Sequence, residues 1–283
     1  MAPLLVIDAD SLGHRAYHAM PAVEGASGRP VGLLVGFANA LIATWRATEP
    51  RAVIVCLDAR TPSYRHELLP AYQGQRDPFP VDLCEQLDRI PEMAQAFGFA
   101  AAKLVPWEAD DLLATSVALE EARGGGALVV SGDRDTYQLV SDVTSTLHPR
   151  PRGELEQVDR AGVRERYGIE PEQVTSLIAL RGDPSDNIPG ARGIGQKTAS
   201  ELLRRYGDLE GVIAHAGELT PRQRQSVEES ADDLRRYLDV ATMRRGLPIE
   251  IPADGGLDPE SGSRWCAEAG MLGLSKRLAG FAR

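Results

Sequence analysis

The sequence predicts a parallel α/β sheet followed by a mainly helical region, and two patterns carry that prediction. Three short apolar runs lack the alternation of a half-exposed strand, so we expect strands that are buried on both faces. They span residues 4–7, 52–57 and 127–130. Segments with helical spacing lie between them, at 31–48, 81–97 and 109–122. Strands that alternate with helices form parallel sheets with right-handed crossovers.

The second region is expected to begin near 149–153, where proline and arginine accumulate. From about Val158 onward the pattern is helical, with Gly, Asp and Pro between the helical stretches. We therefore expect a sheet region over residues 1–150 and a helical region over residues 151–283.

Charge and cysteine content narrow the functional class. The chain carries 41 acids against 31 bases, and this net charge of -10 by itself disfavours a nucleic-acid partner. The arginines nevertheless cluster late in the chain, at 204–205, 222–224, 235–236 and 244–245. Three widely spaced cysteines support neither a disulfide framework nor a structural zinc site. We find no signal peptide and no membrane-spanning stretch, so we expect a cytoplasmic protein.

Acidic residues stand where the predicted strands end. Asp8, Asp58 and Asp133 each follow one of the three runs, and open parallel sheets bind ligands beyond the carboxyl ends of their strands. The full set of candidate metal ligands is Asp8, Asp58, Glu108, Asp110, Asp111, Asp133, Asp135, Asp183 and Asp186. Converging carboxylates repel one another unless divalent cations belong to the site. Oxygen ligands without His or Cys favour magnesium or manganese, with some acids acting through water.

Each acidic cluster also has a purely structural explanation. Glu108 and Asp111 would cap a helix, Asp183 and Asp186 would serve as turn residues, and Asp8 would be a surface acid. Folding requirements alone seldom place five such clusters at strand ends and helix starts, so we favour the metal site.

A glycine-rich segment, 187–199, predicts a helix, a glycine hairpin and a second helix. It is not a P-loop, because Gln196 separates Gly195 from Lys197 and the preceding segment is helical in pattern. Exposed backbone N–H groups and a helix N-terminus can hold a phosphate. A plain helix–helix turn is the alternative.

Six motifs follow one another along the chain. They are Ile7-Asp8, Leu57-Asp58-Ala59 with residues 63–67, and the segments 108–111, 132–135, 182–190 and 193–198. Together they resemble the bacterial 5′-nuclease or flap endonuclease family, which includes the 5′-exonuclease domain of DNA polymerase I. The resemblance covers residues 4 to about 251. It implies a PIN-like sheet, a helical arch at about 60–92, and a helix-3-turn-helix form of the helix-hairpin-helix at 176–206. A polymerase domain would need far more chain, so we expect a stand-alone relative.

The resemblance also implies an activity. It indicates a structure-specific 5′-3′ exonuclease and flap endonuclease of DNA replication and repair, which uses two metal ions and leaves 5′-phosphate and 3′-hydroxyl ends. The first ion would be served by Asp8, Asp58, Glu108, Asp110, Asp111 and Asp133, and the second by Asp135, Asp183 and Asp186. Duplex DNA would contact Gly190, Gly193, Gly195, Lys197 and Thr198, where the backbone would also hold a potassium ion. The expected partners are DNA with 5′ flaps, nicks or 5′ ends, and RNA primers as a further class; the location would be the nucleoid.

The arch segment departs from the family pattern. Relatives carry Tyr-Lys-x-x-Arg, whereas this chain reads Tyr72-Gln73-Gly74-Gln75-Arg76, so the arch lysine is absent. Lys103 is expected to lie away from the arch, and we therefore expect Arg76 or Arg65 to supply the missing charge as catalytic groups.

Three further residues are predicted to contact the displaced strand. Arg15 would pair with a phosphate, and Tyr17 and Tyr72 would stack on bases. Tyr17 would alternatively be an ordinary packing residue.

Two other functions fit part of the sequence. A non-catalytic DNA-binding relative would keep the hairpin and lack metal ligands, and the full set of acids argues against it. A PIN-type ribonuclease would act on RNA, and the hairpin expected to grip duplex DNA argues against that.

Overall fold

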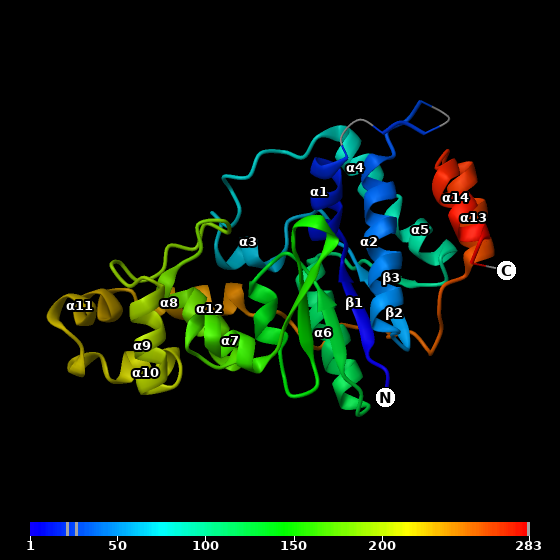
Figure 1. Cartoon of the computed structure of the whole chain (residues 1–283). Helices are drawn as coiled ribbons and strands as arrows, with labels where there is room; N and C mark the ends of the chain where they lie inside the picture. Colours follow the sequence, from blue (N-terminus) through cyan, green and yellow to red (C-terminus); the bar gives the residue numbers. More distant parts are fainter. Residues whose placement is uncertain (21–22, 26–27, 282–283) are drawn as a thin grey trace.

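Six strands form one sheet in the computed structural model, which describes residues 1–20, 23–25 and 28–281 (Figure 1). The strands are β1 (Leu4–Asp8), β2 (Ala52–Cys56), β3 (Ala100–Ala102), β4 (Ala127–Val130), β5 (Ser145–Pro149) and β6 (Leu155–Val158), in the order β3-β2-β1-β4-β5-β6. Neighbours pair in parallel except β5 and β6, which are antiparallel. The predicted parallel α/β sheet is confirmed, and its three predicted strands begin at the expected residues.

Helices cover both faces of the sheet. The connections that follow β1 and β2 cross one face, whereas the connection from β3 to β4 crosses the other. The helices on the first face are α1 (Ala9–Ala19), α2 (Gly32–Thr48), α4 (Val81–Leu87) and α5 (Ile90–Ala96). On the second face lies α6 (Ala109–Ala122), which connects β3 to β4. The helix predicted over 81–97 is thus two helices, divided at 88–89. The change of side leaves a crevice beyond the carboxyl ends of β1 and β4, where open sheets bind ligands.

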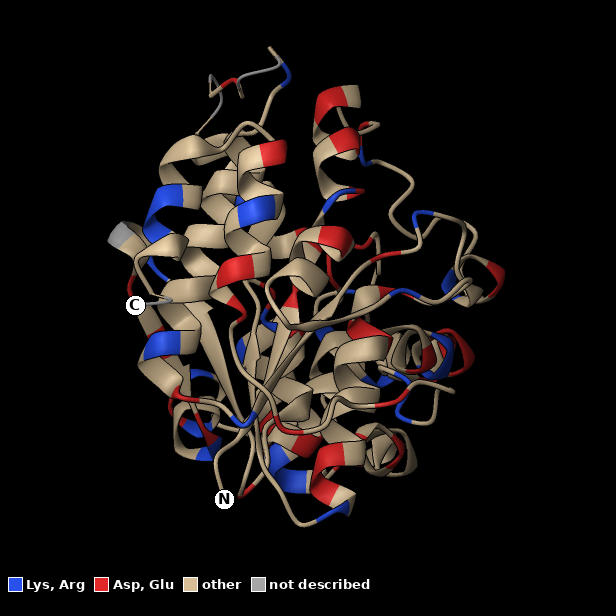
Figure 2. Ribbon diagram, turned by 90° about the vertical axis from the view of Figure 1, so that its right-hand side faces the viewer, with Lys and Arg blue, Asp and Glu red and all other residues tan. Residues whose placement is uncertain are grey.

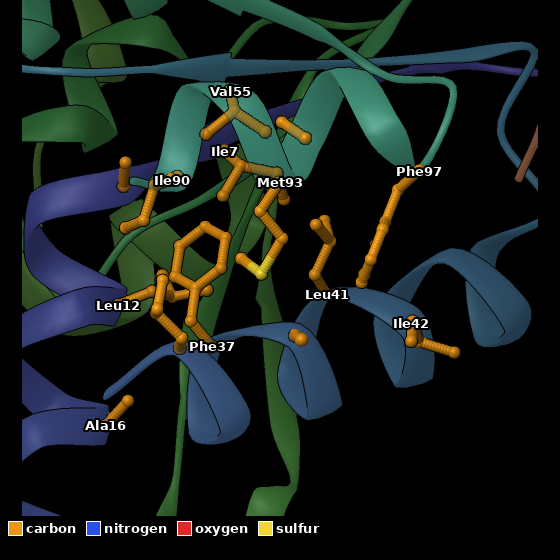
Figure 3. Close-up of a cluster of buried hydrophobic side chains, with 14 of the residues drawn as sticks. Ile7, Leu12, Ala16, Phe37, Leu41, Ile42, Val55, Ile90, Met93 and Phe97 are labelled. Atoms are coloured by element: carbon orange, nitrogen blue, oxygen red, sulfur yellow. The ribbon is translucent and has the colours of Figure 1, made fainter. Parts of the chain in front are cut away.

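The core of the first face lies between the sheet and α1, α2 and α5 (Figure 3). Ile7 and Val55 point from β1 and β2 toward Phe37 of α2 and Met93 of α5. Alternate residues of the same strands point to the other face and pack against Leu112 of α6. This double burial explains why the strands read as continuous apolar runs.

A separate hydrophobic core holds together a group of helices, the helical module, which lies to one side of the sheet in Figure 1. The module comprises α7 (Arg160–Tyr167), α8 (Val174–Arg181), α9 (Gln196–Tyr206), α10 (Leu209–Ala214), α11 (Pro221–Glu229) and α12 (Ala231–Ala241). Short 3-10 turns lie at 135–139, 151–153, 171–173 and 216–218. Helices α8 and α9 are the expected helix pair of 176–206, and the glycine-rich hairpin joins them.

The boundary expected at residue 150 lies elsewhere in the structure. Strand β6 comes after that residue yet pairs with β5 in the sheet. Helices α13 (Pro259–Glu268) and α14 (Leu272–Ala279) return to the first face, where Cys266 is buried beside α5. The helical module therefore covers only about 160–241, because α13 and α14 pack their apolar sides against the sheet layer instead.

The segment expected to be a helical arch, 60–92, is only partly helical. It begins with the short helix α3 (Tyr64–Leu68) and then runs through a turn and an extended stretch to α4 (Figure 1). Gly74, Pro78 and Pro80 account for the break, because glycine costs backbone entropy in a helix and proline lacks an N–H donor.

Charged residues of both signs are interspersed over the side of the molecule shown in Figure 2. Several clustered arginines of the helical module form ion pairs: Arg205 with Glu218, Arg224 with Glu228, and Arg235 with Glu210. These clusters are therefore largely neutralised. None of the helices in the described ranges combines the length and the apolar character that crossing a bilayer would require.

Candidate active site

Seven carboxylates from five segments line one hollow of about 380 Å³ at the ends of β1 and β4. They are Asp8, Asp10, Asp58, Glu108, Asp110, Asp133 and Asp186. Six of the seven are among the acids singled out in the sequence. The remaining predicted acids, Asp111, Asp135 and Asp183, do not line the hollow.

Asp8 ends β1 and is also the N-cap of α1. Its Oδ1 accepts a hydrogen bond from the N–H of Ser11 at 3.0 Å, and its Oδ2 accepts one from Ser131 Oγ at 2.6 Å. The residue is only 5% exposed. Burial, the largest effect, raises the pKa of Asp8 to about 7. Because the strand passes directly into a helix, this carboxylate is held rigidly at the floor of the hollow.

Asp10 and Asp58 connect three elements around the hollow. Asp10 Oδ2 accepts from the N–H of Asp58 at 2.8 Å, and Asp58 Oδ1 accepts from the N–H of Ala109 at 2.6 Å. Burial raises the pKa of Asp10 to about 6 and that of Asp58 to about 7. Sequence reasoning missed Asp10, although its place in the first helical turn after a strand-end acid was a usable signal.

The negative charge of Asp133 acts on two groups of acids. Burial is the largest cause of the raised pKa in each neighbour, and the charge of Asp133 adds to it for Asp8 and Asp110 on one side and for Asp135 and Asp186 on the other. Asp133 Oδ1 also accepts from the N–H of Asp135 at 2.8 Å. A change in the charge of Asp133 therefore alters the pKa values of acids in both groups.

The donor set fits hard divalent cations. Carboxylates that are buried together lose hydration and repel one another, and their raised pKa values record both effects. His14 is the residue of the lining whose ring nitrogen could bind a metal. Its ring packs edge-on against Phe79, with 4.4 Å between the ring centroids. Within residues 1–20, 23–25 and 28–281, no three His, Cys, Asp or Glu side chains are placed to hold one ion directly. Carboxylate oxygens are the ligands that hard divalent cations prefer.

Asp111 and Arg65 form an ion pair in the interior of the protein. Arg65 Nη1 and Nη2 donate to the two oxygens of Asp111 at 2.7 and 2.9 Å, and the N–H of Arg244 donates to Asp111 Oδ1 at 2.9 Å. Arg65 Nε donates to the carbonyl of Val240 at 2.9 Å. Both side chains are buried, so Asp111 has no oxygen left for an ion and Arg65 cannot reach a phosphate. We therefore correct both assignments: the pair ties α3 and α6 to α12.

Gln73 and Arg76 face the hollow from the turn that follows α3. Arg76 Nη2 donates to Asp186 Oδ1 at 2.6 Å, and Gln73 Nε2 donates to the same oxygen at 3.1 Å. The side chain of Arg76 is 44% exposed. Of the two arginines expected to replace the arch lysine, only Arg76 is positioned to do so.

Lys103 lies nearer to the acids than expected. It directly follows β3, and its Nζ is 3.6 Å from Asp88 Oδ1. Its positive charge opposes the burial that raises the pKa of Asp10. Lys103 nevertheless does not line the hollow.

Asp135 and Asp183 lie behind the lining. Asp183 Oδ1 accepts from the N–H and the Oγ of Ser185 at 2.8 and 2.6 Å. Burial raises the pKa of Asp135 well above its ordinary value, and the charges of Asp133, Asp186 and Asp183 contribute. Both acids therefore interact with the cluster by charge rather than by facing the hollow.

The residues predicted to stack on or pair with the displaced strand are mostly engaged elsewhere. The Tyr17 hydroxyl donates to Asp82 Oδ2 at 2.9 Å and joins α1 to α4, which favours its packing role. Tyr72 is 4% exposed and its hydroxyl donates to Glu108 Oε2 at 3.1 Å, so its ring is not free to stack. Arg15 is exposed, and its Nη2 donates to the carbonyl of Arg150 at 2.6 Å.

The predicted helix, hairpin and helix are present at α8 and α9. Gly190 has a φ of 69°, and a Cβ there would lie 2.3 Å from the backbone N of Gly182, so only glycine fits. Gly193 and Gly195 are exposed, and Gly195 is the N-cap of α9. Lys197 is exposed in the first turn of α9. The hairpin thus places exposed glycines and a positive charge close together at the start of a helix, where an anion can bind.

The raised pKa values predict how the stability of the metal-free protein changes with pH. The folded-state pKa values of Asp8, Asp10 and Asp58 are about 7, 6 and 7, above the value of about 4 for an unfolded aspartate. Between these values the folded protein keeps protons that the unfolded chain releases. The free energy of unfolding is therefore expected to fall as pH rises from about 4 to 7. Magnesium should raise the Tm most above that window, which thermal unfolding in EDTA and in magnesium would measure.

Asp58→Asn is the matched variant for this prediction. Asparagine keeps an acceptor for the N–H of Ala109 but does not titrate, so the metal-free Tm should fall less steeply than in the wild type. Burial lowers the pKa of His14 and His148, which acts in the opposite direction, and the comparison with the variant removes that contribution. Equal slopes for the variant and the wild type would contradict the prediction.

Two family models match the chain. The model described as the 5′-3′ exonuclease N-terminal resolvase-like domain matches residues 3–168, and that described as the 5′-3′ exonuclease C-terminal SAM fold matches residues 169–260. The join between them falls after α7 rather than at residue 150.

Relatives of known name and structure agree with these matches. The thermostable DNA polymerase I of Thermus thermophilus is 37% identical over 258 residues, which make up 91% of this chain and 30% of the polymerase. A T5 5′-exonuclease with bound zinc has a TM-score of 0.73 and 22% identity, covering 99% of this chain and 100% of that one. A bacteriophage T5 flap endonuclease in a pseudo-enzyme–product complex with DNA and metal ions has a TM-score of 0.72 and 22% identity, covering 99% of both chains.

Proposed function

This chain belongs to the 5′-3′ exonuclease family, and from that premise we propose that it is a divalent-metal-dependent nuclease acting on DNA near 5′ ends. It hydrolyses phosphodiester bonds as a 5′-3′ exonuclease and flap endonuclease in replication and repair. The observation that carries the proposal is the hollow at the ends of β1 and β4, which is lined by seven carboxylates and by Arg76. The chain spans 30% of the length of the polymerase that it matches, and the activity proposed is that of the matched part alone.

At least two magnesium or manganese ions are proposed to occupy the hollow. The first group of ligands, direct or through water, is Asp8, Asp10, Asp58, Glu108, Asp110 and Asp133. The second ion would be held by Asp186, with Asp135 and Asp183 acting through water or by charge from behind the lining. When bound, the ions would supply an activated water and counter-charge for the phosphodiester. The metal ions named for the two bacteriophage T5 structures support this part of the proposal.

The protein's own residues position these ligands before DNA arrives. Glu108 Oε1 accepts from Ser63 Oγ, and its Oε2 accepts from the Tyr72 hydroxyl at 3.1 Å and lies 3.3 Å from Arg65 Nη1. Arg76 would orient the phosphate above the carboxylates. Preorganised charges of this kind cost no rearrangement during the reaction.

The duplex part of the substrate is proposed to bind the hairpin. Backbone N–H groups of Gly193 and Gly195 would hold a phosphate, with Lys197 and Thr198 beside it. Carbonyl oxygens between 190 and 195 would hold a potassium ion, and RNA primers would be a further substrate class. The bacteriophage T5 flap endonuclease was solved in a complex with DNA, which supports DNA as the ligand class.

Cleavage of a 5′-labelled DNA flap tests the function directly. We expect cutting with magnesium or manganese and none in EDTA, with an RNA flap cut much more slowly in parallel. Duplex binding without cutting under any metal would indicate a non-catalytic DNA-binding relative. Faster cutting of the RNA flap would indicate a ribonuclease.

A further inference from the structure

The guanidinium group of Arg222 lies against the glycine hairpin. Arg222 is in the first turn of α11, far along the chain from the hairpin. A Cβ built on Gly193 would be 3.5 Å from Arg222 Nε and Nη2 and 3.7 Å from Cζ. The guanidinium therefore covers the side of the hairpin on which any other residue would carry its side chain.

Arg222 is exposed, and its charge is not neutralised as those of neighbouring arginines are. On the same helix Arg224 Nε bonds Glu228 at 2.8 Å, and nearby Arg235 Nε bonds Glu210 at 2.8 Å. Within the described residues, no acid lies within ion-pair distance of Arg222. Its positive charge is therefore available to an anion that approaches the hairpin.

Arg222 and Arg192 share the wall of an open hollow of about 510 Å³ between the hairpin and helices α11 and α12. Glu229, about 10 Å along α11 from Arg222, and Asp233 of α12 form the acidic wall of the same hollow; Glu229 accepts from Gln225, and Asp233 pairs with Arg236. A phosphate is repelled by the acidic wall and attracted by the basic one. The hollow thus favours an anion at its hairpin side only.

We propose that Arg222 and Arg192 bind a second backbone phosphate of duplex DNA, next to the phosphate held by the hairpin N–H groups. The inference rests on the proposed function, since it concerns the same duplex. A guanidinium group can donate two parallel hydrogen bonds to the oxygens of one phosphate. Backbone contacts set register without reading sequence, so this site acts on all duplex sequences alike.

The test compares Arg222→Ala with Arg224→Ala, two neighbouring arginines of one helix. Binding of a labelled blunt DNA duplex is measured by fluorescence anisotropy in EDTA over a range of KCl concentrations. For Arg222→Ala the slope of log affinity against log salt is expected to decrease by about 0.9, which is about eightfold in affinity for each tenfold change in salt. Arg224→Ala should keep the wild-type slope, and Arg222→Lys should keep most of it.

An unchanged slope for Arg222→Ala overturns the inference, and so do equal losses in the two alanine variants or a wild type that does not bind duplex. Flap cleavage by the wild type is measured separately with magnesium. Salt-dependent duplex binding that Arg222→Ala weakens, without any cleavage, would sink the nuclease proposal and leave the Arg222 site standing.

Discussion

Asp133→Asn is expected to slow flap cleavage by about a hundredfold while sparing DNA binding. Loss of groups that support a metal site typically costs 10 to 100-fold, and Asp133 adds its charge to both groups of acids around the hollow. Asparagine keeps the shape and the acceptor for the N–H of Asp135 but removes the charge. Single-turnover cleavage of a 5′ flap with magnesium measures the rate, and duplex anisotropy measures binding.

Asp142→Asn is the control for this experiment. It removes one negative charge from a side chain that is 90% exposed and lies 3.5 Å from Arg160 rather than at the hollow. It should cut at the wild-type rate, and any general gain in DNA affinity from lost negative charge should appear in both variants. Near wild-type cutting by Asp133→Asn would show that the two proposed ion positions do not share this residue.

Arg76→Ala is expected to reduce single-turnover cleavage by about a hundredfold, equivalent to about 3 kcal/mol. The chain has Gln73 where the family pattern has a lysine, and Gln73 cannot carry charge. Arg76 is the positively charged residue that lines the hollow, and it is held there by Asp186 at 2.6 Å. A fixed guanidinium at this position would stabilise the charge that develops on the phosphate.

Three variants separate charge from positioning. Gln75 Nε2 donates to the carbonyl of Pro184, so Gln75→Ala loosens the same turn without removing charge and should cost much less. Arg76→Lys should recover part of the rate, and Gln73→Lys should leave it unchanged or raise it. A normal rate for Arg76→Ala together with a strong gain for Gln73→Lys would mean that no arginine replaces the lysine.

Regular patterns in the sequence predicted the strands that are buried on both faces. The runs at 4–7, 52–57 and 127–130 became β1, β2 and β4, because double burial demands continuous apolar residues. The remaining strands carry weaker signals. The β3 sequence is three alanines, which have low strand preference, and β5 contains Ser145, Thr146 and His148 near the edge of the sheet.

The carboxylate cluster was predictable because strand ends of a parallel sheet meet at one edge. Which acid of a pair faces that edge was not predictable. Asp110 and Asp111 are neighbours on α6, and successive helix residues point about 100° apart. Asp110 faces the hollow, while Arg65 occupies both oxygens of Asp111.

The sequence by itself therefore determined the parallel sheet, the acidic edge and the glycine hairpin, since each follows from local periodicity or from a motif. Only the tertiary structure decided which positive charges lie at the hollow and at the hairpin. Arg65 is neutralised by Asp111, 46 residues away, whereas Arg76 reaches the hollow. Arg222, which belongs to α11, lies against the hairpin that joins α8 and α9. Such pairings depend on which side chains the packed helices bring together. No local pattern in the sequence shows which residues, far apart in the chain, will meet.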